Sequence, residues 1–117
     1  MESNIVVQPS VLREIDTFYY NMWQKYKHSW GEEEIVKLIS DAYDEVYNIK
    51  SITTHRNATK EGWEGLFMAN FKNWYFAYKI NGDTIYVEDA CHSQNMHEAI
   101  HRVINLIERI NNLTSNN

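Results

Sequence analysis

Two stretches of alternating side chains, joined by Asn81-Gly82, constrain the fold of this chain more than any other feature. Between residues 73 and 80, aromatic and aliphatic side chains occupy every second position, as in a strand with one buried face. Asn-Gly is typical of a two-residue type I′ turn, because both residues tolerate positive φ. The returning strand is expected over residues 84–90. With this turn, Tyr78 pairs with Ile85 on the buried face.

The opposite face of this predicted hairpin carries polar and tyrosine side chains, which are Tyr75, Lys79, Tyr86 and Glu88. Residues on one face of an antiparallel pair are neighbours across the strands, so these four are expected to lie together. Exposed tyrosines on such sheets are usually good strand formers only, although they can also stack on nucleic-acid bases. Both interpretations stay open at this point.

The start of the chain predicts a short strand followed by a helix. Residues 5–8 are mostly apolar and precede Pro9, which ends the strand. Ser10 then stands where a helix N-cap is expected. Apolar residues at helical spacing predict a helix over roughly 10–27 with a broad buried face.

A second helix is expected over roughly 30–50. Ser29 and Glu32 have the spacing of a capping box, in which each side chain accepts a hydrogen bond from the other residue's free backbone N–H. Apolar positions at helical spacing, with Val36 and Tyr47 among them, form its expected inner face. The two helices therefore make a helical hairpin.

The remaining segments complete an α+β fold. Residues 53–62 are polar and predict a surface loop, residues 63–71 a strand, and residues 96–113 a C-terminal helix. The predicted order is β-α-α-β-β-β-α, with a mainly antiparallel sheet packed on the helical hairpin. A chain of 117 residues is expected to form one domain, residues 1–117.

Composition limits the location and the cofactors of the protein. No apolar run is long enough to span a membrane, and the single Cys91 fits a reducing compartment, so a cytoplasmic protein without membrane contact is expected. Only four glycines are present and none forms a phosphate-binding loop. His97 and His101 flank Glu98 without the ligand spacing of a zinc helix, so neither a metal nor another cofactor is expected.

The order of the elements and two local patterns resemble the RelE/ParE toxin superfamily, with more similarity to its ParE-like members. Residues 75–87, followed by Ala90-Cys91-His92, are similar to the aromatic strand, Gly-Asp turn and strand that lead to a histidine in that family. Residues 7–15 are similar to its strand-to-helix start. The resemblance covers roughly residues 4–97. It implies a RelE/ParE-like fold.

The resemblance also implies the toxin component of a bacterial toxin–antitoxin pair, which inhibits growth and has an antitoxin protein as its partner. ParE-like members act by binding DNA gyrase, whereas RelE or HigB members cleave mRNA on the ribosome. Tyr75 stands where many relatives have arginine, and a C-terminal catalytic tyrosine would fall near Met96. These departures, and a net charge of -5, favour binding over cleavage. A diverged, inactive binding domain and a homodimer stay open.

If the protein is an endonuclease, its candidate catalytic residues are His92, Tyr75, Tyr86 and Glu88. The candidate substrate-binding residues are Arg56, Lys60, Lys72 and Lys79. A histidine with a near-neutral pKa can transfer a proton at the 2′-hydroxyl or the 5′-oxygen, and cations stabilise the charge that develops on phosphate. A structural role for His92 and a solvated loop for Arg56 and Lys60 are the alternative interpretations.

An antitoxin is expected to cover exposed apolar and sheet-edge surface of the protein. The C-terminal helix over residues 96–113 is expected to occupy part of that surface itself.

Overall fold

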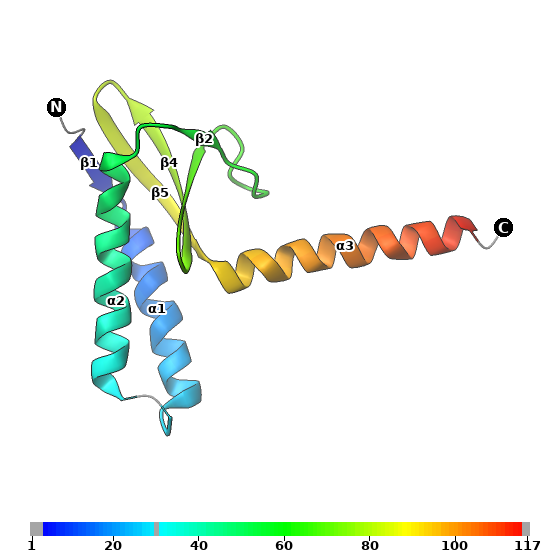
Figure 1. Ribbon diagram of the computed structural model, residues 1–117, viewed down its shortest axis with the longest axis horizontal. Coiled ribbons are helices and arrows are strands. Elements are labelled where there is room, and N and C mark those ends of the chain that lie inside the picture. The colour runs from blue at the N-terminus through cyan, green and yellow to red at the C-terminus, as the bar shows by residue number, and fades with distance from the viewer. Residues whose placement is uncertain (1–3, 30, 116–117) are drawn as a thin grey trace.

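The computed structural model describes residues 4–29 and 31–115, without the side chains of 97–105 and 114–115. Its order agrees with the predicted β-α-α-β-β-β-α, with one additional short strand and a 3₁₀ turn (Figure 1). The elements are β1 (Asn4–Val7), α1 (Pro9–Tyr26), α2 (Glu32–Tyr47), η1 (Asn48–Ser51), β2 (Arg56–Asn57), β3 (Phe67–Phe71), β4 (Trp74–Asn81), β5 (Thr84–His92) and α3 (Ser93–Ser115).

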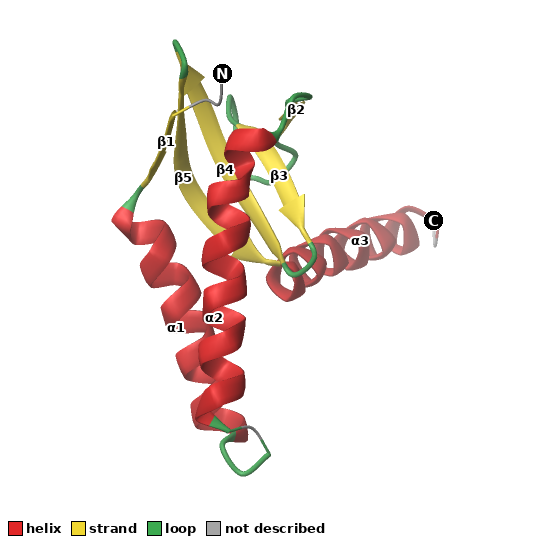
Figure 2. Ribbon diagram, turned by 60° about the vertical axis from the view of Figure 1, so that its left-hand side comes forward, coloured by secondary structure: helices red, strands yellow, loops and turns green. Residues whose placement is uncertain are grey.

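The five strands form one sheet in the order β1-β5-β4-β3-β2. β1 pairs with β5 in parallel, and the other three pairings are antiparallel. The hairpin of α1 and α2 lies against one face of this sheet (Figure 2). The predicted α+β fold, a mainly antiparallel sheet packed on a helical hairpin, is confirmed.

The hydrophobic core fills the space between the hairpin and the sheet. Its fully buried side chains include Trp74, Phe76 and Tyr78 from β4 and Val11 and Ile15 from α1. Alternate residues of β4 thus point toward the helices, as the periodicity of that strand predicts. The buried aromatic side chains make the inner face of β4 the centre of the core.

The turn between β4 and β5 lies one residue later than predicted. Asn81 pairs with Thr84, so Gly82 and Asp83 form the loop. Gly82 has a φ of 64°, which fits a type II′ turn with glycine at its first central position. Moving the loop by one residue shifts each pairing by two, so Tyr78 lies opposite Val87 instead of Ile85. The buried face is preserved because side chains alternate with a period of two.

The ends of the helices also differ from the predictions. α1 begins at Pro9, because a proline at the first helical position needs no N–H partner, and Gln8 rather than Ser10 is the N-cap. The predicted capping box is wrong, since α2 is preceded by Gly31 and has no side-chain cap. Val36 and Tyr47 are 65% and 44% exposed, so they do not belong to the inner face of α2.

Two details of the 53–71 region differ as well. Arg56 and Asn57 form β2 on the edge of the sheet, opposite Met68 and Phe67, within the segment that the sequence predicts to be a surface loop. Conversely, the strand expected from residue 63 starts only at Phe67. The segment before β3 is irregular, and its glycines Gly62 and Gly65 have φ values of 92° and 81°. These left-handed conformations end any regular extended structure there.

α3 extends away from the sheet and the hairpin after its first turns (Figure 1). The Cα radius of gyration is 17.5 Å, against about 13 Å for a compact chain of this length. Beyond its first turns, α3 therefore leaves the sheet and the hairpin uncovered. That it occupies part of an antitoxin-binding surface stays a prediction. No helix in the described part of the chain is both long enough and apolar enough to cross a membrane.

Candidate functional site

A β-bulge in β5 decides where the candidate residues point. Tyr78 lies opposite Val87, but Ala77 lies opposite Asp89, so Glu88 is an extra residue without a partner in β4. Such an insertion exchanges the two faces of the strand beyond it. Residues of β5 after Glu88 that simple alternation places on the open face of the sheet, such as His92, therefore point toward the helices.

His92 is the residue that this exchange affects most. It lies opposite Trp74, and its ring stacks on Phe18 of α1 with a centroid distance of 4.0 Å and an interplanar angle of 14°. It also makes an edge contact with Trp74, at a centroid distance of 5.2 Å. His92 thus lies on the helical side of the sheet, away from the tyrosine face. Burial in this aromatic environment lowers the pKa of His92 below its usual value.

The hydrogen bond of His92 defines its tautomer. The backbone N–H of Gln94 donates to Nδ1 of His92 at 3.1 Å. Nδ1 is therefore unprotonated, and the proton of the neutral ring resides on Nε2. Because the lone pair of Nδ1 is already engaged, the neutral ring can donate from Nε2 but has no free basic nitrogen. This geometry suits a residue that caps the start of α3 better than it suits a general base.

The open face of the sheet brings together Lys79, Tyr86 and Glu88. Nζ of Lys79 lies 3.3 Å from Oε1 of Glu88 and 5.7 Å from the centroid of the Tyr86 ring. The positive charge of Lys79 is thus already paired with a carboxylate and an aromatic face. Tyr75 lies opposite Cys91, at the other end of β4. Tyr75 precedes Lys79 by four positions, or about 13 Å along a strand.

The middle of this face is covered by the segment before β3. Trp63 is only 2% exposed, and its Nε1 donates to Oδ2 of Asp89 at 2.8 Å. Asp89 lies opposite Ala77, which is completely buried although it points away from the helices. Trp63 therefore separates Tyr75 from the cluster of Lys79, Tyr86 and Glu88. The four residues predicted to lie together form two separate groups.

The other candidate cations lie in different places. Arg56 is exposed on the edge strand β2, and Nζ of Lys60 lies 5.1 Å from the centroid of the Trp63 ring. Lys72 occupies the β3–β4 loop with a φ of 37°. It lies on the side of Glu45, where burial raises the pKa of the carboxyl group and the positive charge of Lys72 opposes that rise. None of these three shares a described contact with His92. The structure leaves the predicted phosphate-binding cations dispersed.

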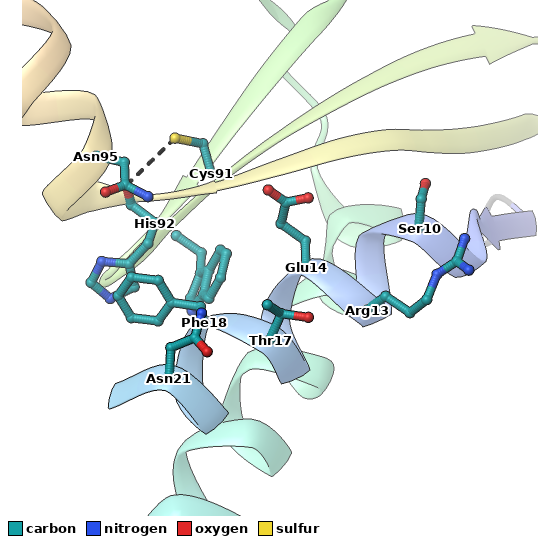
Figure 3. Close-up of a pocket in the computed structure, with 10 residues that line it drawn as sticks. Ser10, Arg13, Glu14, Thr17, Phe18, Asn21, Cys91, His92 and Asn95 are labelled. Atoms are coloured by element: carbon teal, nitrogen blue, oxygen red, sulfur yellow. Dashed lines mark hydrogen bonds between the residues drawn. The ribbon is translucent and has the colours of Figure 1, made fainter. Parts of the chain in front are cut away.

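The pocket next to His92 is built mainly from α1. It has a volume of about 440 Å³ and lies between α1, the end of β5 and the start of α3 (Figure 3). Its polar lining residues on α1 are Ser10, Arg13, Glu14, Thr17 and Asn21. A second pocket of about 300 Å³ shares Phe18, Asn21 and Asn95 with the first. The two form one groove along α1, which we call the α1 groove.

The α1 groove runs beside an edge of the sheet. β1 pairs only with residues 84–87 of β5, so among the described residues no strand flanks the end of β5 on that side. In Figure 3, Glu14 points from α1 toward this strand end, while Arg13 lies toward the start of α1 and far from His92. The groove therefore offers polar side chains and a strand edge, without bringing Arg13 to the imidazole.

Sequence reasoning missed the residues of the α1 groove because it followed the apolar rows of α1. A signal was present: Ser10, Glu14, Thr17 and Asn21 follow one another at helical spacing and form a polar stripe. The side chains of His97, Glu98 and His101 lie outside the described residues. Among the side chains that are described, no group of three or more His, Cys, Asp or Glu has the arrangement of a metal site.

No protein-family model matches this sequence, and comparison with curated proteins finds no match either. Among solved structures, the chain is similar to one in the crystal structure of the toxin–antitoxin complex RelBE2 from Mycobacterium tuberculosis. The two share 13% sequence identity and superpose with a TM-score of 0.43. The similarity covers 79% of this chain and 99% of the other.

Proposed function

We propose that this protein is the toxin component of a toxin–antitoxin pair and acts by binding a protein target such as DNA gyrase, without catalysis. The ParE-like pattern that ends in His92 suggests this role. One observation favours binding over cleavage: Nδ1 of His92 already accepts a hydrogen bond from the backbone N–H of Gln94 at 3.1 Å. A general base must have a free lone pair within reach of the proton it removes.

The distribution of charge supports the same proposal. Cleavage of RNA needs cations and an acid–base group around one phosphate. Here Lys79 is paired with Glu88 on the open face, whereas His92 lies on the helical side. A toxin that acts by binding a protein needs only a surface complementary to its target, and that surface can be acidic or basic.

The α1 groove is the surface that we propose for the antitoxin. An extended peptide can add to the unpaired side of the β5 end while its side chains contact the polar stripe of α1. Phe18 supplies an apolar floor, and Asn21 and Asn95 supply hydrogen-bonding groups where the two pockets meet. Asn21→Lys is then expected to weaken antitoxin binding, whereas Asn70→Lys, at an exposed position of β3, leaves it unchanged.

A ribosome-dependent mRNA endonuclease is the second candidate function. One observation favours it: His92 and Glu14 both line the same open pocket, and each can carry a proton. In that case the Gln94 N–H must leave Nδ1 in the complex with RNA. A diverged, inactive binding domain is the third candidate.

Growth and mRNA measurements separate these candidates. Wild type, His92→Phe and the matched control His28→Phe are induced in a bacterial host, and the purified proteins are added to a gyrase supercoiling assay. His92→Phe keeps the stacked ring and removes both nitrogens. Equal growth arrest by all three, with intact mRNA and inhibited gyrase, supports binding.

The other outcomes contradict the proposal in distinct ways. If wild type cleaves mRNA and His92→Phe loses about 100-fold of that activity, the protein is an endonuclease. If none of the three proteins arrests growth, the toxin assignment itself is wrong. Near-ultraviolet circular dichroism on each variant confirms that the aromatic core around Trp74 is intact.

A further inference from the structure

Apolar side chains along α3 are exposed to solvent. Leu106, Ile107 and Leu113 are 56%, 51% and 73% exposed. The total accessible surface is 8447 Å², whereas a compact protein of this mass exposes about 6,700 Å². A contiguous apolar surface of this kind usually marks an interface.

The sequence of α3 has the spacing of a coiled coil. Met96, Ile100, Val103, Ile107 and Ile110 follow one another in alternating steps of four and three residues. Met96 is only 8% exposed and packs within the domain, so the part of the repeat open to a partner begins at Ile100. This is the repeat of the a and d positions of a heptad. Within the 23 residues of α3, the apolar repeat covers residues 96–110, about two heptads, because the next seam position is Thr114. A helix pair built on this seam is short, so the apolar residues beside the seam must add to its stability.

The positions that flank this seam are uncharged. One side carries Ala99, Leu106 and Leu113, and the other carries His97, Ile104 and Asn111. In coiled coils, charged residues at the flanking e and g positions attract a partner of opposite charge and repel an identical copy that carries like charges. Two identical copies of α3 meet no such repulsion. The helix as a whole also has no net charge, with Glu98 and Glu108 balanced by Arg102 and Arg109.

We propose that two copies of this chain dimerise by pairing their α3 helices in antiparallel orientation. The total surface in excess of a compact protein is about 1,700 Å² per copy and includes all sides of the extended helix. Pairing covers one side of α3, about half of that excess, which is close to the roughly 800 Å² that a specific interface needs from each partner. α3 extends away from the sheet and the hairpin, so a second helix can approach it (Figure 1). This inference does not rest on the proposed function.

Charge determines the orientation. Because α3 is neutral, the net charge of -5 belongs to the rest of the chain. In a parallel pair the two acidic portions would meet at the same end. In an antiparallel pair they lie at opposite ends of a helix about 35 Å long, several Debye lengths apart at physiological salt. The antiparallel register also places Ile100 opposite Ile110 of the second copy, and Val103 opposite its Ile107.

The first test measures mass in solution by light scattering during gel filtration. Wild type is expected to be a dimer, and Ile107→Glu a monomer, because a buried glutamate in the seam is strongly unfavourable. The control Asn105→Glu places the same charge on the opposite side of the helix and should remain dimeric. The helical signal of Ile107→Glu should also fall, since an isolated helix of this length is marginal in water.

Near-ultraviolet circular dichroism keeps this test interpretable, because an unchanged aromatic signal shows that the core remains folded. A monomeric wild type would overturn the proposal, including a wild type that associates only when a different protein is added. A dimer that survives Ile107→Glu would also overturn it.

The second test determines the orientation by disulfide formation. In a Cys91→Ser background, Ile100→Cys and Ile110→Cys proteins are mixed, unfolded and refolded together, and oxidised. Antiparallel pairing predicts the mixed 100–110 disulfide. Parallel pairing would give only the two homodisulfides and would overturn the antiparallel arrangement. Neither test depends on toxicity, so its failure is distinct from failure of the proposed function.

Discussion

Two buried tyrosines differ in what their hydroxyl groups satisfy, and this predicts unequal costs for the same mutation. Tyr19 accepts a hydrogen bond from Nε1 of Trp74 at 3.0 Å, and both side chains are at most 2% exposed. Tyr78 is also buried, but its hydroxyl contacts Nδ1 of His55 at 2.8 Å, and His55 is exposed. Removing the hydroxyl of Tyr19 leaves a buried donor without a partner, whereas His55 can turn to water.

The expected magnitudes follow from this difference. Tyr19→Phe should lower the free energy of unfolding by about 2 kcal/mol, within the range for an unsatisfied buried group. Tyr78→Phe should cost about 1 kcal/mol, the net value of an ordinary hydrogen bond. For a chain of this size, 1 kcal/mol corresponds to roughly 4 °C in Tm. The two variants are therefore expected to unfold about 8 °C and 4 °C below the wild type.

Urea unfolding, followed by tryptophan fluorescence and circular dichroism, measures both free energies, and unchanged slopes would show that the unfolded state is the same. Tyr20→Phe is the control, because Tyr20 is 58% exposed and should change stability by less than about 0.5 kcal/mol. In a Trp74→Phe background, Tyr19→Phe should cost less, since no indole N–H remains to be satisfied. An equal or larger cost for Tyr78→Phe would refute this reasoning.

Three further predictions concern the strand ends and the open face. Burial lowers the pKa of His92, so the unfolded chain binds more protons than the folded one near pH 6. The free energy of unfolding should therefore fall as pH decreases below about 6.5. Urea titrations at several pH values should show a smaller decrease for His92→Phe than for wild type. Gly82→Ala should lower the free energy of unfolding by about 1 to 2 kcal/mol, because Gly82 has a φ of 64°. Gly31→Ala should lower it by less than about 1 kcal/mol, because the φ of Gly31 is -81°. Thermal unfolding of both variants measures the difference. A double-mutant cycle on Lys79 and Glu88 should give a coupling below about 1 kcal/mol that decreases with salt, and a larger, salt-independent value would contradict the assignment of a surface ion pair.

The sequence was most informative where one periodicity ran without interruption. Alternation in β4 predicted its buried face correctly, since Phe76 and Tyr78 are both completely buried. Helical spacing likewise identified Val11 and Ile15 on α1. These patterns are reliable because a whole face of each element is buried together, and a change of face would expose several apolar side chains at once.

The bulge at Glu88 could not be predicted from the same alternation. Residues 84–88 alternate regularly, and an unbroken pattern would also place His92 on the face of Tyr86. What stabilises the bulge is the tertiary contact of Asp89, whose carboxylate accepts from Trp63 Nε1 and from the backbone N–H of Ala90. Trp63 comes from a segment 26 residues earlier in the chain, so no local pattern contains this information.

The bulge has a consequence for what the protein can do. With unbroken alternation, His92 would share the open face with Tyr86 and Glu88, and an acid–base group would stand beside a tyrosine and a lysine. The extra residue instead turns His92 onto Phe18, where its Nδ1 accepts from the Gln94 N–H and its ring meets Trp74 in an edge contact. At that position His92 joins the end of β5 to the start of α3. His92→Ala, which removes the stacked ring, should therefore loosen the join between β5 and α3 and lower the near-ultraviolet circular dichroism signal of the core, whereas His92→Phe, which keeps the ring, should change that signal little. This outcome would separate a positioning role for His92 from a catalytic one.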